Sequence, residues 1–348
     1  MSGQRFTLWT IALVAVIAAI GYRMSTMRES PAEPHPKVAF IASGSGPYWQ
    51  ATINGAKAAA RDKRVDLRVE VPKGNENVEE QIQILSVLDV KDLSGIALSP
   101  IDAERQTHLI NQMVREGKKV VTLDSDAPLS DRHNYVGTNN IAAGETAARL
   151  VKEALPQGGK VAVLLANLTK NNMVDRKAGF EEVIAQAGAG DEAAPDYEVV
   201  GYQVDEGDSE RCAQNIREAL EAHPDLACFV GMTARSGPIL LKELEEQGKL
   251  GQIKLVTFDD APETLQGIED GSIHATVAQD PYKYGYEAIS MLASLCRNPE
   301  VGLPIVGKGF FFVSVEPIRQ DNLAAFRDRL KARQKATESK GGGDKEAG

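Results

Sequence analysis

Short apolar runs alternate with amphipathic segments between residues 37 and 320, at intervals of roughly 25–30 residues. The apolar runs are continuous, which is the pattern of parallel strands buried on both faces of a sheet. They predict strands over residues 38–42, 67–71, 95–98, 120–123, 161–165, 199–202, 228–231, 254–258, 276–278 and 310–315. The chain is therefore expected to be built on parallel sheets.

The segments between these runs have helical periodicity. Trp49, Ile53, Ala56 and Ala60, for example, fall on one face of a helix. Helices are predicted over residues 47–61, 78–89, 103–115, 141–154, 174–186, 209–222, 236–247 and 282–295. The alternation indicates a doubly wound α/β fold. About ten strand–helix units are too many for one compact sheet, whereas two sheets of five or six strands suit a length of 348 residues.

The two ends of the chain differ from this pattern. Residues 8–22 carry no charge and are flanked by Arg5 and Arg23, which is the pattern of an export signal. No A-x-A cleavage site follows, so residues 1–28 are expected to be either a signal peptide or an N-terminal membrane anchor. Residues 29–36 are rich in proline and predict an extended linker. Residues 321–348 form a charged tail, which is expected to be helical from residue 324 and disordered in its last part.

Composition and charge narrow the range of functions. Hydrophobic residues make up 43% and charged residues 25%, which excludes wholesale disorder and a polytopic membrane protein. The formal net charge is −10, and residues 37–326 alone carry −14. So acidic a body repels phosphate backbones, and no nucleic-acid partner is expected.

The sequence gives little support for a metal site, a disulfide framework or a cofactor site. Cys212, Cys228 and Cys296 are far apart and form no C-x-x-C pair, so they are expected to be buried apolar residues. The five histidines show no metal-binding spacing. The glycine-rich segment 43–46 completes neither a phosphate loop nor a dinucleotide fingerprint. We expect no cofactor, no metal and no catalytic residue.

Residues whose side chains can bind a ligand follow the ends of several predicted strands. In open α/β sheets ligands bind at the carboxyl ends of the strands. The residues in question are Ser43, Tyr48, Trp49, Asp124, Ser125, Asp126, Asp259 and Gln279. Aromatic faces for C–H surfaces, together with carboxylates and an amide for hydroxyls, are what a polyol ligand needs.

Each of these residues also has a structural interpretation. The aspartates can cap helices or form turns, and the two aromatic residues can cover their own helix. Likewise, the segment 207–209 superficially resembles a hydrolase serine signature but is better interpreted as a helix N-cap. The combination of aromatic, acidic and amide groups at several strand ends favours ligand binding.

The segments GSGPYWQ, TLDSDAP, YVGTNN, DRKAGF and FDDAPETLQGIEDGSIHATVAQDPY together resemble the ribose-type (type I) periplasmic sugar-binding proteins, the substrate-binding subunits of ATP-binding cassette (ABC) sugar transporters. The resemblance extends from Lys37 to Ile318. It implies two Rossmann-like lobes with parallel sheets, joined by a hinge of three segments. Lobe one would comprise residues 37–138 and 280–307, and lobe two residues 139–279 and 308–320. The chain would cross near residues 138–139, 279–280 and 306–309.

The resemblance also implies roles for single residues. Tyr48 and Trp49 match the family's stacking pair, and Asp124 matches the carboxylate that binds two adjacent hydroxyls. The other implied contacts are Ser43, Arg176, Asp259 and Gln279, with Ser125 and Asp126 where ribose-binding members have an arginine, and Met232 or Ser236 where they have an asparagine. The second-lobe aromatic residue falls near Gly207, so one stacking face is expected to be missing.

The function implied is that of an extracytoplasmic solute-binding protein. It would act as a monomer that captures a monosaccharide or similar polyol by hinge closure and delivers it to an inner-membrane ABC permease. It would lie in the periplasm or on the outer face of the cytoplasmic membrane, touching the membrane only through its N-terminal segment. The alternative is a ligand sensor that presents bound sugar to a receptor kinase or chemoreceptor. An enzyme on the same fold is a third possibility, disfavoured because no nucleophile–base pair is recognisable.

Overall fold

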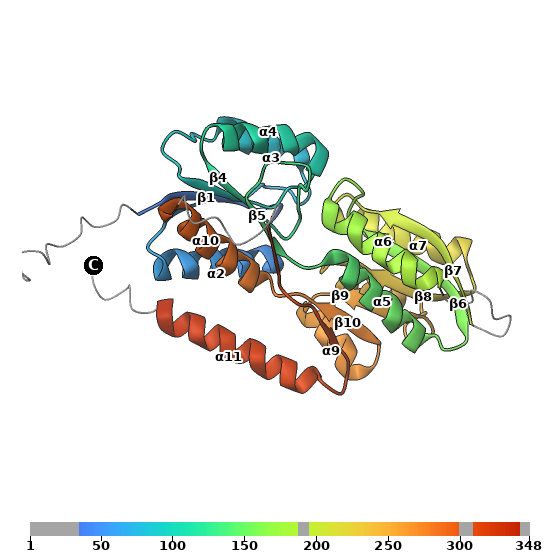
Figure 1. The fold of residues 1–348 in the computed structure, drawn as a ribbon. Helices are drawn as coiled ribbons and strands as arrows, with labels where there is room; N and C mark the ends of the chain where they lie inside the picture. Colours follow the sequence, from blue (N-terminus) through green and yellow to red (C-terminus); the bar gives the residue numbers. More distant parts are fainter. Residues whose placement is uncertain (1–34, 187–194, 299–308, 342–348) are drawn as a thin grey trace, which may run out of the picture. The chain divides into compact units, whose positions relative to one another are not determined.

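The computed structural model describes residues 35–186, 195–298 and 309–341. Residues 36–348 belong to one compact unit, which contains two six-stranded sheets (Figure 1). Each sheet with its helices is called a lobe below. The doubly wound two-lobe α/β fold expected from the sequence is thereby confirmed.

Lobe one is built on a sheet with the strand order β11-β5-β4-β3-β1-β2. All of its neighbouring strands pair in parallel. The strands are β1 (Lys37–Ile41), β2 (Asp66–Glu70), β3 (Gly95–Leu98), β4 (Lys119–Leu123), β5 (Asn134–Gly137) and β11 (Gly309–Phe312). The helices are α2 (Pro47–Asp62), α3 (Val78–Val87), α4 (Ala103–Arg115) and α10 (Pro281–Arg297).

Lobe two repeats this arrangement with the order β12-β10-β9-β8-β6-β7, in which only β12 is antiparallel to its neighbour. The strands are β6 (Gly158–Leu165), β7 (Asp196–Val204), β8 (Leu226–Gly231), β9 (Lys254–Phe258), β10 (Ala275–Ala278) and β12 (Glu316–Ile318). The helices are α5 (Asn140–Ala154), α6 (Asn171–Ala185), α7 (Ser209–Ala222), α8 (Ser236–Glu246), α9 (Pro262–Asp270) and α11 (Leu323–Gly341).

Apolar side chains cover both faces of each sheet, which explains the continuous apolar runs in the sequence. In lobe one, α2 and α10 pack on one face, and α3 and α4 on the other. In lobe two, α5 and α6 pack on one face, and α7, α8, α9 and the start of α11 on the other. The edge strands β2 and β7 are only partly buried, because each has a neighbour on one side only.

Two helix pairs approach closely enough to require glycine. A Cβ atom on Gly55 of α2 would lie 1.9 Å from the Tyr282 carbonyl oxygen of α10. On α5, a Cβ atom on Gly144 would lie 2.0 Å from the Arg176 carbonyl oxygen of α6. The second contact brings the backbone that carries Arg176 against α5 and thereby fixes where this side chain starts.

The third crossing between the lobes differs from the expectation. Residues 308–320 were expected in lobe two, with the crossing near residues 306–309. Instead, β11 pairs with β5 of lobe one, and β12 pairs with β10 of lobe two. The crossing therefore falls between Phe312 and Glu316. The apolar sequence of β11 completes the edge of the first sheet, which the local pattern could not assign to either lobe.

Three short elements were not predicted: β5, β12 and α9. Strand β5 has the sequence NYVG and β12 has EPI, and neither contains an apolar run long enough to be recognised. In the tail, α11 follows β12 and packs against α9 (Figure 1). Leu323 and Phe326 of α11 are buried in the lobe-two core. Residues 342–348, for which disorder was expected, lie outside the described residues, as do residues 1–34 with the expected signal or anchor.

No helix within residues 35–186, 195–298 and 309–341 combines the length and the apolar composition needed to cross a membrane.

Candidate ligand-binding site

A cavity of about 1220 Å³ is lined by residues from both lobes. It lies at the carboxyl ends of the central strands, where the sequence predicts a ligand site. Of the predicted residues, Tyr48, Trp49, Asp124, Arg176, Asp259 and Gln279 line it. The fold thus brings together residues that are separated by up to 231 positions in the chain.

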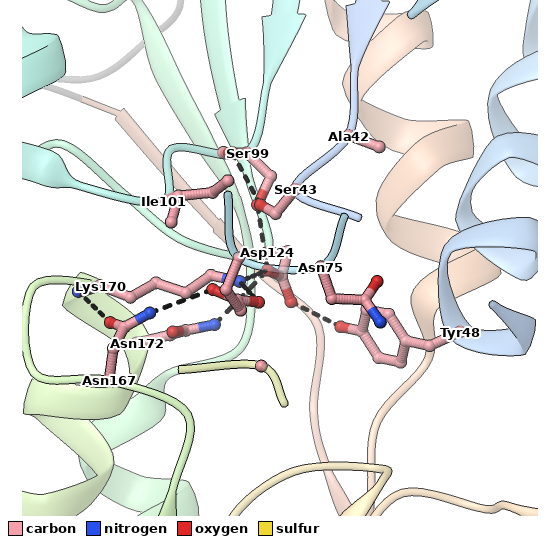
Figure 2. A network of polar contacts seen from close by, with 12 residues as sticks. Ala42, Ser43, Tyr48, Asn75, Ser99, Ile101, Asp124, Asn167, Lys170 and Asn172 are labelled. Carbon is pink, nitrogen blue, oxygen red and sulfur yellow. Dashed lines mark hydrogen bonds and ion pairs between the residues drawn. The ribbon is translucent and has the colours of Figure 1, made fainter. Parts of the chain in front are cut away.

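The Asp124 carboxylate is bound from several directions (Figure 2). The Tyr48 hydroxyl donates to Oδ1 at 2.6 Å, and the Ser99 hydroxyl donates to Oδ2 at 3.0 Å. The Asn172 amide, from lobe two, lies 3.4 Å from Oδ2. Burial and the charge of Asp124 raise the pKa of Tyr48 well above its ordinary value, so its hydroxyl keeps the proton that it donates. Asp124 therefore has protein partners on both carboxylate oxygens.

Ser43 supports this carboxylate from behind. Its hydroxyl oxygen lies 2.8 Å from both the carbonyl and the hydroxyl oxygen of Ser99, which in turn donates to Asp124. Ser43 is fully buried and is not among the residues that line the cavity. Ser43 therefore supports Ser99, which holds Asp124, and the predicted contact between Ser43 and a ligand is not supported by its position.

Asp259 is the counterpart of Asp124 in lobe two, but its environment is different. Its side chain is 3% exposed, and its Oδ1 atom has no hydrogen-bond partner among the described residues. Burial raises the pKa of Asp259 to about 7, although the nearby Arg176 guanidinium lowers it and the charges of Asp260 and Asp124 raise it further. A buried, unpartnered acceptor at the cavity wall is a place for a ligand donor.

Arg176 is held in a fixed orientation. Its Nε, Nη1 and Nη2 atoms donate to the Asn140 side chain, the Met232 carbonyl and the Gln279 side chain at 2.9, 2.7 and 2.8 Å. The guanidinium carbon lies 4.5 Å from the centroid of the Phe258 ring. A guanidinium has five N–H groups, so Arg176 keeps donors for a ligand beyond the three that these bonds use.

Gln279 connects the site to the crossing segments. Its side-chain oxygen accepts from Arg176, while its amide nitrogen donates to the hydroxyls of Thr138 and Tyr284 at 2.9 and 3.1 Å. Thr138 lies directly after β5, in the first crossing from lobe one to lobe two. Both ends of the amide are thus committed to the protein, and Gln279 ties the ligand cavity to the hinge.

Tyr48 and Trp49 form an edge-to-face pair with ring centroids 5.4 Å apart. Tyr48 is half-buried, whereas Trp49 is only 7% exposed and belongs to the lobe-one core. The Lys170 ammonium lies 5.6 Å from the centroid of the Trp49 ring. Tyr48 therefore offers more ring surface to a ligand than Trp49 does.

Besides Ser43, four predicted ligand contacts lie away from the cavity lining: Ser125, Asp126, Met232 and Ser236. Asp126 forms a buried ion pair with Arg132 and accepts from Thr122 at 2.6 Å, so its carboxylate is occupied within lobe one. Met232 contributes its carbonyl oxygen to Arg176, and its side chain is in the core.

Ser125 and Ser236 are fully buried, and the Ser236 hydroxyl pairs with that of Thr233 at 2.9 Å. The Ser125 hydroxyl has no hydrogen-bond partner among the described residues. Ligand contact by these four side chains stays a prediction, which their positions outside the cavity lining do not support.

The sequence interpretation missed the segments that follow β2 and β6. Asn75, Glu76, Lys170 and Asn172 line the cavity, and Asn167 lies next to them. The rule that ligands bind at the carboxyl ends of strands also covers these positions. The polar run ANLTKNN directly after β6 was the signal that could have found them.

Two lobes of repeated topology, with a cavity lined from both sides, define a binding protein of the two-lobe type. The family described as a periplasmic binding protein domain matches residues 38–300, and the chain belongs to this family. Its fold is that of the type I sugar-binding members, as expected from the sequence.

Individual relatives agree with this assignment. A solved solute-binding protein of an ABC transporter from Burkholderia graminis, in complex with D-arabinose, is 30% identical, with a TM-score of 0.75 over 83% of this chain and 96% of that chain. GanP, a glucose-galactose binding protein from Geobacillus stearothermophilus, is 28% identical, with a TM-score of 0.76 over 84% and 99%. The ribose import binding protein RbsB of Salmonella typhimurium is 21% identical, covering 75% of this chain and 84% of RbsB.

Proposed function

We propose that this chain captures a monosaccharide or a similar polyol between its lobes and delivers it to an ABC transporter. The observation that carries the proposal is a pair of buried acceptors at the cavity wall. Asp259 Oδ1 and Asn172 Oδ1 have no hydrogen-bond partner among the described residues, and each side chain is 3% exposed. A buried acceptor left without a donor costs about 1–3 kcal/mol, which a ligand hydroxyl recovers.

The other groups in the cavity suit the same ligand class. Arg176 supplies donors for ring or hydroxyl oxygens, and the Tyr48 ring supplies an apolar surface for C–H groups. Acceptors, donors and an aromatic face together match a small molecule that carries several hydroxyls on a compact carbon frame.

Delivery to a transporter is supported by family membership and by what the relatives are named for. The Salmonella relative is named as an import binding protein, and the Burkholderia relative as a solute-binding protein of an ABC transporter. We propose that residues 1–28 act as the export signal or anchor and residues 29–36 as a linker, which would place the lobes outside the cytoplasmic membrane.

A thermal-shift titration of the full-length chain tests ligand capture. The probes are D-arabinose, D-ribose, D-allose, D-glucose and D-galactose. A sugar at 100 times its dissociation constant should stabilise the fold by about 2.7 kcal/mol. The control is Asp126→Asn, because Asp126 lies away from the cavity and its variant should retain the shift. If none of these sugars or related polyols changes the melting temperature of the wild-type chain, the proposal is wrong.

The second candidate function is a ligand sensor, favoured by the uncharged segment 8–22 with no A-x-A cleavage site after it. Deleting the gene that encodes this chain from its host distinguishes transport from sensing. Loss of uptake of the bound sugar supports transport, whereas unchanged uptake with loss of a sugar-dependent transcriptional or chemotactic response supports sensing.

A further inference from the structure

Lys170 extends from lobe two into the lobe-one half of the cavity. The residue is the N-cap of α6, and its side chain is only 5% exposed. Its ammonium lies 2.9 Å from Oε1 of Glu76 and 3.7 Å from Oδ2 of Asp124, and both carboxylates belong to lobe one. Figure 2 shows the lysine side chain directed at the Asp124 carboxylate from the side opposite Tyr48. The two lobes are thereby joined by an ion pair.

The ion pair has the support that a buried pair needs. The desolvation of two charges is compensated only where the geometry is good and further hydrogen bonds satisfy the groups. The Asn167 amide donates to Oε2 of Glu76 at 3.1 Å, and the Asn167 side-chain oxygen accepts from the Lys170 backbone N–H at 2.8 Å. One asparagine thus holds both partners in register.

Further contacts join the lobes beside this ion pair. Gly207 of lobe two has a φ angle of +79°, and a Cβ atom there would lie 2.8 Å from the Asn75 carbonyl oxygen of lobe one. The backbone N–H of Ala103 donates to the Thr169 carbonyl at 3.3 Å. The missing side chain at position 207 therefore permits a close approach of the loop that carries Glu76.

We propose that Lys170 is a positioning residue, which with Glu76 holds the two lobes together across the cavity and keeps the Asp124 carboxylate in place. The inference goes beyond the proposed function because it concerns the contact between the lobes rather than a contact with a ligand. The ammonium lies beside Asp124 and near the Trp49 ring. This arrangement directs ligand hydroxyls to the free acceptors of lobe two, Asp259 and Asn172.

The test uses the ligand-free, full-length chain with Trp9→Phe, so that Trp49 is its single tryptophan. Two measurements report closure: acrylamide quenching of Trp49 and the radius of gyration from small-angle X-ray scattering. The variants are Lys170→Met and Glu76→Gln, of which the second keeps the lysine beside the indole. If the ion pair holds the lobes together, both variants should raise the quenching constant by about twofold or more and increase the radius of gyration.

Lys177→Met is the matched control. Lys177 pairs with Glu181 at 2.6 Å and lies 4.5 Å from the Tyr202 ring centroid, but all three residues belong to lobe two. This variant should leave both measurements unchanged. In the double variant Glu76→Gln/Lys170→Met, the effect should not exceed that of the larger single variant, since the two residues act as one unit.

Far-UV circular dichroism and a urea titration establish that each variant is folded under the conditions of the test. If a folded Glu76→Gln chain shows the quenching and radius of the wild type, the proposed role of Lys170 is wrong. The same holds if Lys177→Met changes both measurements equally. Neither result would bear on sugar capture, because no sugar is present in the experiment.

Discussion

Asp124 and Asp259 have the same backbone geometry in the two lobes. Each follows the third strand from the β11 or β12 edge of its sheet, and each has a positive φ angle, 61° and 65° respectively. Their backbone N–H groups donate to the carbonyl oxygens of Val136 and Val277, the third residues of β5 and β10, at 3.0 and 2.9 Å. Left-handed backbone conformations are uncommon for residues other than glycine, and aspartate is among the residues that tolerate them.

The two carboxylates differ in what they bind. Asp124 accepts hydrogen bonds on both oxygens and faces the ammonium of Lys170, whereas Oδ1 of Asp259 has no partner among the described residues. Two equivalent positions have therefore taken different roles. Asp124 is held by protein groups, and Asp259 keeps an acceptor for the proposed ligand.

Ligand affinity should depend on pH through Asp259. Its pKa is raised to about 7, mainly by burial, and hydroxyl donors bind the ionised carboxylate. Affinity for a captured sugar should therefore fall as the pH drops below 7, by at most tenfold per pH unit, and level off above about 7. Calorimetric titrations between pH 5.5 and 8.5 measure this slope. Asp259→Asn should remove it, and an affinity that rises toward low pH would contradict the prediction.

The free energy of unfolding should show the opposite trend. A carboxyl whose pKa is higher in the folded than in the unfolded chain stabilises the fold at low pH. For Asp259 this contribution is complete below the ordinary pKa of 3.8 and is lost as the pH rises toward 7. Between pH 5 and pH 7.5 the ligand-free wild type should lose about 2–3 kcal/mol that Asp259→Asn does not lose. Urea unfolding of both chains at the two pH values provides the comparison.

Asp124 is expected to matter for both binding and stability. Asp124→Ala removes the acceptor for Tyr48 and Ser99 and one of the carboxylates around Lys170, and it strains the left-handed backbone. Asn tolerates that backbone, so Asp124→Asn isolates the charge. Both variants should lose about 1.5–3 kcal/mol of sugar affinity, while only Asp124→Ala also lowers stability markedly. If Asp124→Asn binds sugar like the wild type, Asp124 serves only the turn.

Asp126 should matter for stability but not for sugar affinity, although it lies only two residues from Asp124. Its carboxylate pairs with Arg132, which is 2% exposed and also donates to the Gly309 carbonyl. Asp126→Ala leaves a buried guanidinium without its charge partner and should cost about 3–5 kcal/mol of stability. Sugar affinity, measured by calorimetry at a temperature where the variant is folded, should be unchanged. A large loss of affinity with little loss of stability would return Asp126 to the ligand site.

Trp49 should respond to ligand binding and should also be needed for folding. In a Trp9→Phe chain its emission reports one position, next to Lys170 and Tyr48. A captured sugar should produce a saturable change in this emission. Trp49→Ala should cost about 3–5 kcal/mol of stability, because the ring belongs to the lobe-one core. Trp49→Phe keeps most of the packing and should retain sugar binding. If a sugar binds without changing the emission of Trp49, the sugar lies away from the part of the cavity wall that contains Trp49.

Part of the site could be predicted because it follows directly from the strands. The residue after a buried strand necessarily lies at the carboxyl edge of the sheet, which identified Asp124, Asp259 and Gln279 from local pattern alone. The rule does not say which way a side chain turns. Asp126 and Ser236 lie equally close to the site in sequence, yet both bind protein groups.

The sequence by itself determined the alternation of strands and helices, since burial on both faces of a sheet requires continuous apolar runs. It did not determine how the two lobes meet. Glu76 and Lys170 are 94 residues apart, and Tyr48 and Asp124 are 76 apart, so no local pattern relates them. Only the tertiary structure places the Lys170 ammonium beside Asp124 and leaves Oδ1 of Asp259 without a partner among the described residues. The charges, hydrogen bonds and burial that fix each side chain come from residues distant in the chain.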